Sequence, residues 1–269
     1  MSTTTTTTTT APPYQVTMDL FAHFTSKSEF FAFASACEEG KRYLDLVVCM
    51  TQYVSSPIMT NVAWDNEERT LLSVGYKGVV RPLRHSILCL SQQITNLASD
   101  TATTTDSLKL ALVVLRDGLM DELELHCRNF ITIVEKRVLG ESAFQDDEAL
   151  IWAYKTVGDH RRYEAELAVC EGREHCLASR ELAQDAFTRG MNEAQIKLKP
   201  TSILRLSLAL NFSSFRYEVI KDCEDAQAIA QEALDLAETE MLGMPHTPLN
   251  DTEHLIRMLR QTLEEWKKQ

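Results

Sequence analysis

Apolar residues recur with the period of an α-helix along most of this chain, and no other feature limits the fold as strongly. In one stretch they fall at i, i+3, i+4, i+7, i+8 and i+11: Ala226, Ile229, Ala230, Ala233, Leu234 and Ala237. Similar stripes run from Leu115 to Val134 and from Leu255 to Trp266. Only 9 glycines and 7 prolines occur in 269 residues, which leaves few turns for strands. The pattern therefore predicts an all-α fold in which small alanines let about nine antiparallel helices pack closely.

Three segments lack this period and predict where helices end. Residues 1–17 hold a threonine run followed by Ala-Pro-Pro; such a segment cannot build a core, so we expect it to be disordered. The polar segment from Asn96 to Ser107 predicts a loop between two long helices. The third break, from Gly243 to Pro248, contains prolines that a helix cannot cross. We therefore expect a single helical domain over residues 18–269.

The composition argues against several partners and compartments. A formal net charge of −12 argues against nucleic acid, because its phosphates are held by a basic excess. No apolar run approaches the ~20 residues of a membrane span, and the N-terminus lacks the basic and apolar regions of a signal peptide. Seven scattered cysteines without a CxxC pair are typical of reduced thiols. These features predict a cytoplasmic protein that binds neither nucleic acid nor membrane.

Four polar residues stand out within this acidic chain. Lys77 and Arg84 are seven residues apart, so both emerge on one face of a helix, and Arg162 and Tyr163 belong to another helix. If these helices meet, the cations repel one another unless an anion lies between them. A phosphate group suits such a cluster, because arginine grips two phosphate oxygens and tyrosine donates a hydrogen bond. The alternative is that all four are solvated surface residues paired with Glu or Asp.

Three runs of the sequence carry a resemblance to a known family. They are residues 66–77 (NEERTLLSVGYK), 158–166 (GDHRRYEAE) and 208–213 (LALNFS). In combination they resemble the 14-3-3 family of all-helical adaptors, which bind phosphoserine and phosphothreonine peptides, and the resemblance covers residues 36 to 266. The family's phosphate pocket uses a lysine, two arginines and a tyrosine. The resemblance therefore assigns phosphate binding to Lys77, Arg84, Arg162 and Tyr163.

The resemblance also implies a concave peptide-binding groove. It assigns the groove to these residues: Leu210, Asn211, Ser214, Glu218, Leu255, Met258, Thr262 and Trp266. Asn211 matches the family's asparagine that hydrogen-bonds the peptide main chain. Ser214 replaces a valine, His254 a leucine and Thr262 a second asparagine, and Thr262 also fits as a packed helix residue. Pro82 departs as well, because a proline between Lys77 and Arg84 can kink the helix.

Members of the family are typically dimers, and part of that interface is matched here. The resemblance places Arg42 and Tyr43 in the interface and gives Glu122 the role of the carboxylate that meets the arginine of a second copy. Gly118 replaces a lysine that would pair with the position of Asp45. We therefore expect a homodimer that lacks one of the family's ion pairs.

Other classes of function find little support in the sequence. No HExxH motif, other metal-ligand spacing or glycine-rich phosphate loop occurs. His175 and Cys176, with Cys170 upstream, are the nearest approach to a catalytic pair, but adjacent helix residues point to different faces. We therefore expect no enzyme activity, no cofactor and no metal. Two alternatives stay open: a helical scaffold that binds unmodified peptides, and a divergent family member whose groove has altered or lost phosphopeptide binding.

Overall fold

The protein is built from α-helices throughout the part of the chain that the structure describes. This computed structural model describes residues 18–59, 64–99, 106–140, 146–168, 170, 173–243 and 250–268. Its α-helices are α1 (Lys27–Glu39), α2 (Tyr43–Ser55), α3 (Asn66–Ser99), α4 (Asp106–Val134), α5 (Asp147–Leu167), α6 (Ala178–Lys197), α7 (Ile203–Phe215), α8 (Cys223–Leu242) and α9 (Asn250–Trp266). No strand occurs in these ranges. The all-α prediction is confirmed, while the segment expected to be disordered, residues 1–17, lies outside the described residues.

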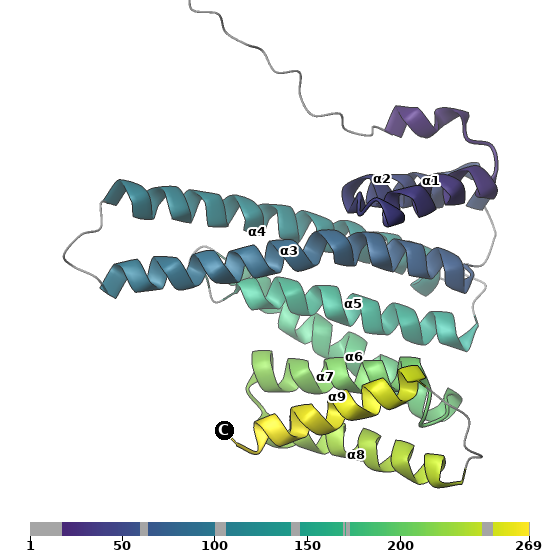
Figure 1. Ribbon diagram of the computed structural model, residues 1–269, viewed down its shortest axis with the longest axis vertical. Helices are drawn as coiled ribbons and strands as arrows, with labels where there is room; N and C mark the ends of the chain where they lie inside the picture. The colour runs from purple at the N-terminus through teal and green to yellow at the C-terminus, as the bar shows by residue number, and fades with distance from the viewer. Residues whose placement is uncertain are drawn as a thin grey trace, which may run out of the picture.

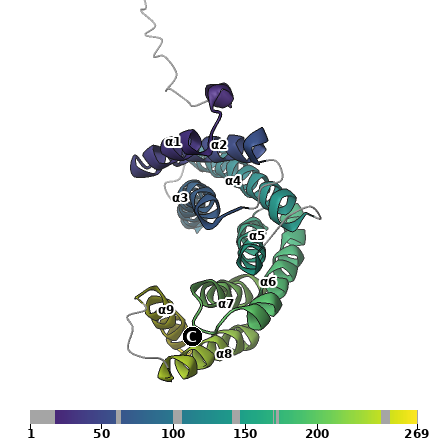
Figure 2. The same cartoon turned by 90° about the vertical axis from the view of Figure 1, so that its right-hand side faces the viewer.

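The helices form an arc with a concave side. Figure 2 shows α3, α5, α7 and α9 along the inner side and α4, α6 and α8 behind them. Helices α1 and α2 cover one end of the arc, and α8 and α9 form the other (Figure 1). The long helices α3 and α4 run beyond α5 at one end, so part of their length has no helix from the second half of the chain beside it.

The hydrophobic core follows the arc as three clusters. The first joins α1–α5 around Phe130, the second joins α5–α7 around Phe187, and the third joins α7–α9 around Leu234. Helices α5, α6 and α7 each contribute to two clusters, since Ala186 of α6 reaches the first, so the halves of the arc are tied together by shared helices. The apolar alanine stripe of α8 is buried here, as its period predicts.

Short polar contacts fix where several helices begin. Ser26 and Glu29 form a capping box at the start of α1. The Asp146 carboxylate accepts a 2.5 Å hydrogen bond from the amide of Ala149 at the start of α5. Asp222 caps α8 in the same way. Caps of this kind satisfy amides in the first turn that have no partner within the helix.

The loop expected between Asn96 and Ser107 is shorter than the polar composition predicts. Helix α3 continues to Ser99 and α4 begins at Asp106, so the prediction is wrong at both ends. Polar side chains in the last turns of α3 bond within the helix: Thr95 Oγ1 donates to the carbonyl of Ser91 at 2.9 Å. Gln92 Nε2 donates to Asn96 Oδ1 at 3.1 Å, so the first residue of the expected loop is tied to the turn before it. At the other end, the Asp106 carboxylate complements the positive N-terminus of α4.

Two further expectations concern the long helices. Pro82 lies inside α3, which is continuous from Asn66 to Ser99, so the proline does not end the helix. The apolar stripe of α4 leaves the core toward its N-terminus: Leu123 is buried, whereas Leu115 is 54% exposed.

All seven cysteines are free thiols. Of the helices that the structure describes, none combines the length and apolarity that crossing a membrane requires.

Candidate functional site

Two arginines from different helices converge on one carboxylate on the inner side of the arc. Arg84 of α3 binds Glu166 of α5 through two parallel hydrogen bonds, Nε to Oε2 and Nη2 to Oε1, each 2.9 Å long. Arg162, one helical turn before Glu166, donates from Nη1 to the same Oε1 at 3.2 Å. The sequence could place Arg84 and Arg162 only on separate helices, and the structure brings them together on Glu166.

Tyr163 completes this cluster. The guanidinium carbon of Arg84 lies 4.2 Å from the centroid of the Tyr163 ring, and that of Arg162 lies 4.8 Å from it. Cations at this range are attracted to the face of an aromatic ring. Burial, helped by the negative charge of Asp159, raises the pKa of Tyr163 to about 12. The phenol therefore stays protonated at neutral pH and remains a hydrogen-bond donor.

Lys77 lies half-buried beside charged residues of α5. Burial lowers the pKa of Lys77, and the positive charge of Lys155 lowers it further, against the opposing effect of Asp159. Lys155 is itself buried and donates to Asp159 at 3.0 Å. Two lysines thus share the neighbourhood of one buried carboxylate, which leaves an excess of positive charge on this part of the inner side.

Asn211 of α7 is tied to the same carboxylate. Its Nδ2 donates to both oxygens of Asp159, at 2.8 and 2.9 Å. Although burial opposes ionisation, Lys155 and Arg162 hold the pKa of Asp159 below its ordinary value. Asp159 therefore remains charged and orients the Asn211 amide relative to the cations on α3 and α5.

The other residues assigned to the groove belong to α7, the adjoining turn and α9. Glu218 approaches the cluster, with its Oε2 3.9 Å from Arg162 Nη1. Trp266 stacks on Tyr217 with ring centroids 4.4 Å apart and is 9% exposed. Met258 is exposed, Leu210 is buried, and the remaining three are half-buried: Ser214, Leu255 and Thr262. Helix α9 packs against α7 and α8.

Sequence reasoning missed three residues of the site: Lys155, Asp159 and Glu166. A signal for them existed, because Lys155 and Asp159, and likewise Arg162 and Glu166, are spaced i, i+4 and form ion pairs on α5. The sequence could not indicate that Glu166 also binds Arg84, which lies 82 positions earlier in the chain.

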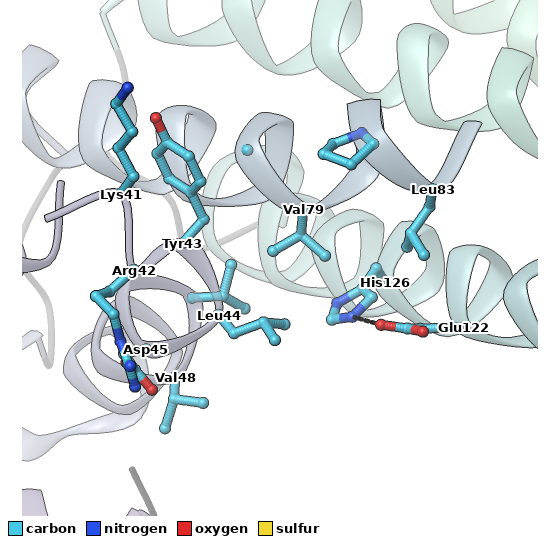
Figure 3. Close-up of a pocket in the computed structure, with 13 residues that line it drawn as sticks. Lys41, Arg42, Tyr43, Leu44, Asp45, Val48, Val79, Leu83, Glu122 and His126 are labelled. Carbon is cyan, nitrogen blue, oxygen red and sulfur yellow. Dashed lines mark hydrogen bonds and ion pairs between the residues drawn. The ribbon is translucent and has the colours of Figure 1, made fainter. Parts of the chain in front are cut away.

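The three residues assigned to a dimer interface line one cavity, away from the arginine cluster. Arg42, Tyr43 and Glu122 line a cavity of about 830 Å³ between α2, α3 and α4 (Figure 3). Within the chain Arg42 pairs with Asp45, and Glu122 lies 3.8 Å from His126. This cavity has mostly apolar side chains around it, among them the exposed Leu44.

Comparison with known proteins identifies the family. The family model described as 14-3-3 protein matches residues 33–267. The checkpoint signal transducer rad24 of Schizosaccharomyces pombe is 31% identical over 242 residues, covering 90% of this chain and 85% of that protein. The 14-3-3 protein theta of Mus musculus is 30% identical over 241 residues, covering 89% and 92%, and 14-3-3 protein 3 of Entamoeba histolytica is 30% identical over 244 residues, covering 90% and 95%. This chain therefore belongs to the 14-3-3 family.

Proposed function

We propose that this protein is a non-catalytic adaptor that binds phosphoserine or phosphothreonine peptides on the inner side of its arc. One observation carries the proposal: Arg84 and Arg162, from two helices, are already aligned on a shared anion, and both guanidinium groups lie close to the Tyr163 ring. Binding would clamp, mask or bridge client proteins after they are phosphorylated.

A phosphate group fits this cluster better than the carboxylate that occupies it. Glu166 supplies one negative charge to two arginines, whereas a phosphorylated side chain carries about −1.5 to −2 at pH 7 and three acceptor oxygens. The Arg162 side chain is only 11% exposed, so little side-chain freedom is lost when it binds. In this proposal Lys77 adds a third positive charge and the Tyr163 hydroxyl donates to a phosphate oxygen.

The residues on α7 and α9 would hold the peptide on one side of the phosphate. Asn211, oriented by Asp159, would hydrogen-bond the peptide main chain. Apolar and polar wall positions would be supplied by Leu210, Ser214, Glu218, Leu255, Met258, Thr262 and Trp266. Because Ser214 and Thr262 replace an apolar and an amide residue of the family pattern, the preferred peptide sequence should differ from that of other members.

We also propose that two copies associate through the cavity lined by Arg42, Tyr43 and Glu122. Arg42 of one copy would reach Glu122 of the other. The exposed Leu44 in its lining supports an apolar contact. The free thiols of the chain support a reducing compartment, and we propose the cytoplasm.

The experiment that tests phosphate recognition is a titration of two labelled peptides followed by fluorescence anisotropy. One peptide carries Arg-x-x-phosphoserine-x-Pro and the other is its unphosphorylated twin. We expect the phosphorylated peptide alone to bind with a low-micromolar or lower Kd. Lys77→Glu and Arg162→Ala should each weaken binding at least about tenfold, since each removes charged contacts to the phosphate.

A matched control variant is Arg189→Ala, which removes an exposed arginine of α6 that pairs with Asp185 outside the cluster. It should bind like the native protein, and circular dichroism should be the same for all variants. Equal binding of both peptides would instead indicate a general helical scaffold. Binding of neither would indicate a groove with altered or lost phosphopeptide recognition, and the departures Ser214, His254 and Thr262 would then be reverted first.

A further inference from the structure

A second cluster, of side chains that can ligate a metal ion, lies outside the proposed peptide site. Glu124 belongs to α4, while His175 and Cys176 belong to the short helix Glu174–Leu177 that precedes α6. One donor atom from each residue can be chosen so that all three lie within 4.8 Å of one another. Carboxylate oxygen, imidazole nitrogen and thiolate sulfur are the three donor types that Zn²⁺ takes in proteins.

The spacing within the cluster is close to that of a tetrahedral zinc site. His175 Nε2 lies 3.1 Å from Glu124 Oε2, and Cys176 Sγ lies 3.7 Å from the other oxygen of the same carboxylate, Oε1. With zinc bonds of about 2.0–2.3 Å, tetrahedral geometry puts neighbouring N and O ligands about 3.4 Å apart, so the Nε2–Oε2 pair is already near the spacing of two ligands. The two donor atoms that lie farthest apart must approach each other by about 1 Å to reach ligand spacing. The His175 side chain is 59% exposed and is free to make that movement.

The surroundings of Glu124 resemble the outer shell of a metal site. Arg173 Nη1 donates to Glu124 Oε1 at 2.5 Å, which leaves Oε2 toward His175. Arg173 is itself neutralised by Asp121, whose Oδ1 lies 2.8 Å from Nη2. A carboxylate that ligates through one oxygen commonly accepts a hydrogen bond on the other, which fixes its direction. The Arg173 contact is thus compatible with metal binding at Oε2, which also lies 3.8 Å from Nη2 of the exposed Arg128.

We propose that Glu124, His175 and Cys176 form a zinc site that joins α4 to the connection between α5 and α6. The ligand atoms are Oε2, Nε2 and Sγ, and water takes the fourth position. On binding, the thiol of Cys176 releases its proton to solvent and its sulfur bonds the metal. The carboxylate and thiolate together balance the charge of Zn²⁺. Without metal, the same three side chains remain a hydrogen-bonded contact between these segments.

The test is a titration of the purified, reduced full chain with Co²⁺, followed by displacement with Zn²⁺. Cobalt bound to a thiolate gives a charge-transfer absorption in the near ultraviolet. We expect one equivalent of cobalt to produce this band and one equivalent of zinc to remove it. Zinc should also raise the Tm by at least about 4 °C, because a ligand that binds only the folded state stabilises it.

Variants separate this cluster from other thiols of the chain. Cys176→Ser and His175→Ala should each remove the cobalt band and the zinc-dependent rise in Tm; His175 is exposed, so its replacement leaves the packing intact. The control is Cys89→Ser, because Cys89 is an exposed thiol whose Sγ lies 3.6 Å from Nε2 of His85, away from Glu124. Cys89→Ser should behave like the native protein. Absence of the band in the native protein, or its persistence in Cys176→Ser, would overturn the proposal.

Discussion

Glu166 is the residue whose charge decides how available the two arginines are. It holds Arg84 and Arg162 in place, and it also repels any phosphate that approaches them. Glu166→Gln keeps a hydrogen-bonding side chain of the same shape but removes the negative charge. We predict that this variant binds the phosphopeptide about threefold to tenfold more tightly, since repulsion between neighbouring charges is lost.

The measurement is the anisotropy titration at low salt, where charge effects are least screened. Glu238→Gln on α8 is the control, because it removes the same charge from a residue paired with Arg260 instead. Weaker binding by Glu166→Gln would show that the ionised carboxylate is needed to position the arginines. That result would count against phosphate displacing Glu166.

His160 carries a second prediction at this scale. Its ring is buried, stacks on Phe130 with centroids 3.9 Å apart and contacts the carbonyl of Thr156 through Nδ1 at 2.8 Å. Burial lowers the pKa of His160 to about 4 from 6.5. Between these two pH values the unfolded chain binds a proton that the folded chain does not. The free energy of unfolding should therefore fall as the pH falls, by up to about 3 kcal/mol.

Urea unfolding at several pH values measures this dependence. His160→Phe keeps an aromatic ring against Phe130 and cannot titrate, so its stability should change less between pH 6.5 and pH 4. Other groups also titrate in this range, so the informative quantity is the difference between the two slopes. Equal slopes would contradict the proposed role of His160.

The residue scale also shows where sequence reasoning stops. The four residues proposed to bind phosphate could be named from the sequence, because the family motif fixes their identity and spacing. Glu166 and Asp159 could not be assigned roles, because each serves a helix far away in the sequence: Glu166 binds Arg84 of α3, and Asp159 binds Asn211 of α7. Such contacts depend on how the helices are arranged in the folded protein. Helical periodicity in the sequence identifies only the apolar side of each helix.

At the scale of elements, α2 packs tightly on α3 at Gly78. A Cβ atom added at Gly78 would lie 2.1 Å from Cγ of Tyr43, near the root of that ring. Gly78→Ala therefore has to push the ring or the helices apart, and we predict a loss of about 1–3 kcal/mol in the free energy of unfolding. Urea denaturation measures it.

Gly118→Ala is the matched control within α4. No atom lies within 4 Å of a Cβ built there, so only helix propensity changes. Alanine should stabilise the helix by up to about 1 kcal/mol. If both substitutions had the same effect, the contact between Gly78 and Tyr43 would not limit how closely α2 and α3 pack.

The period of the apolar residues was sufficient to predict these helices but not their ends. The connection between α3 and α4 illustrates the reason. Its polar composition predicts a loop from Asn96, yet the Asn96 side chain accepts a hydrogen bond from Gln92 one turn earlier, and the helix continues to Ser99. Helix ends are decided by individual bonds of this kind, and composition averages over them.

At the scale of the whole molecule, the proposed dimer depends on an apolar contact at one end of the arc. Leu44 is 52% exposed beside the cavity between α2, α3 and α4 (Figure 3). We predict that Leu44→Glu raises the dimer Kd at least about tenfold, because it places a charge in an apolar contact. Leu242→Glu on α8 is the control: Leu242 is 89% exposed and lies at the opposite end of the arc from α2. Sedimentation equilibrium distinguishes the two variants, and a monomeric native protein would contradict the interface.

Pairing two arcs would also change which clients are bound. A client with two phosphorylated sites could occupy both copies at once, so its affinity should exceed that of a singly phosphorylated peptide by about 10²–10⁴ when the spacing fits. Leu44→Glu should remove this gain but leave the affinity for a single site unchanged, because Leu44 lies outside the arginine cluster. Anisotropy titrations with the two peptides measure both effects. If the doubly phosphorylated peptide kept its advantage in a variant shown to be monomeric, the gain would come from rebinding at a single site, and the second copy would not be needed to explain it.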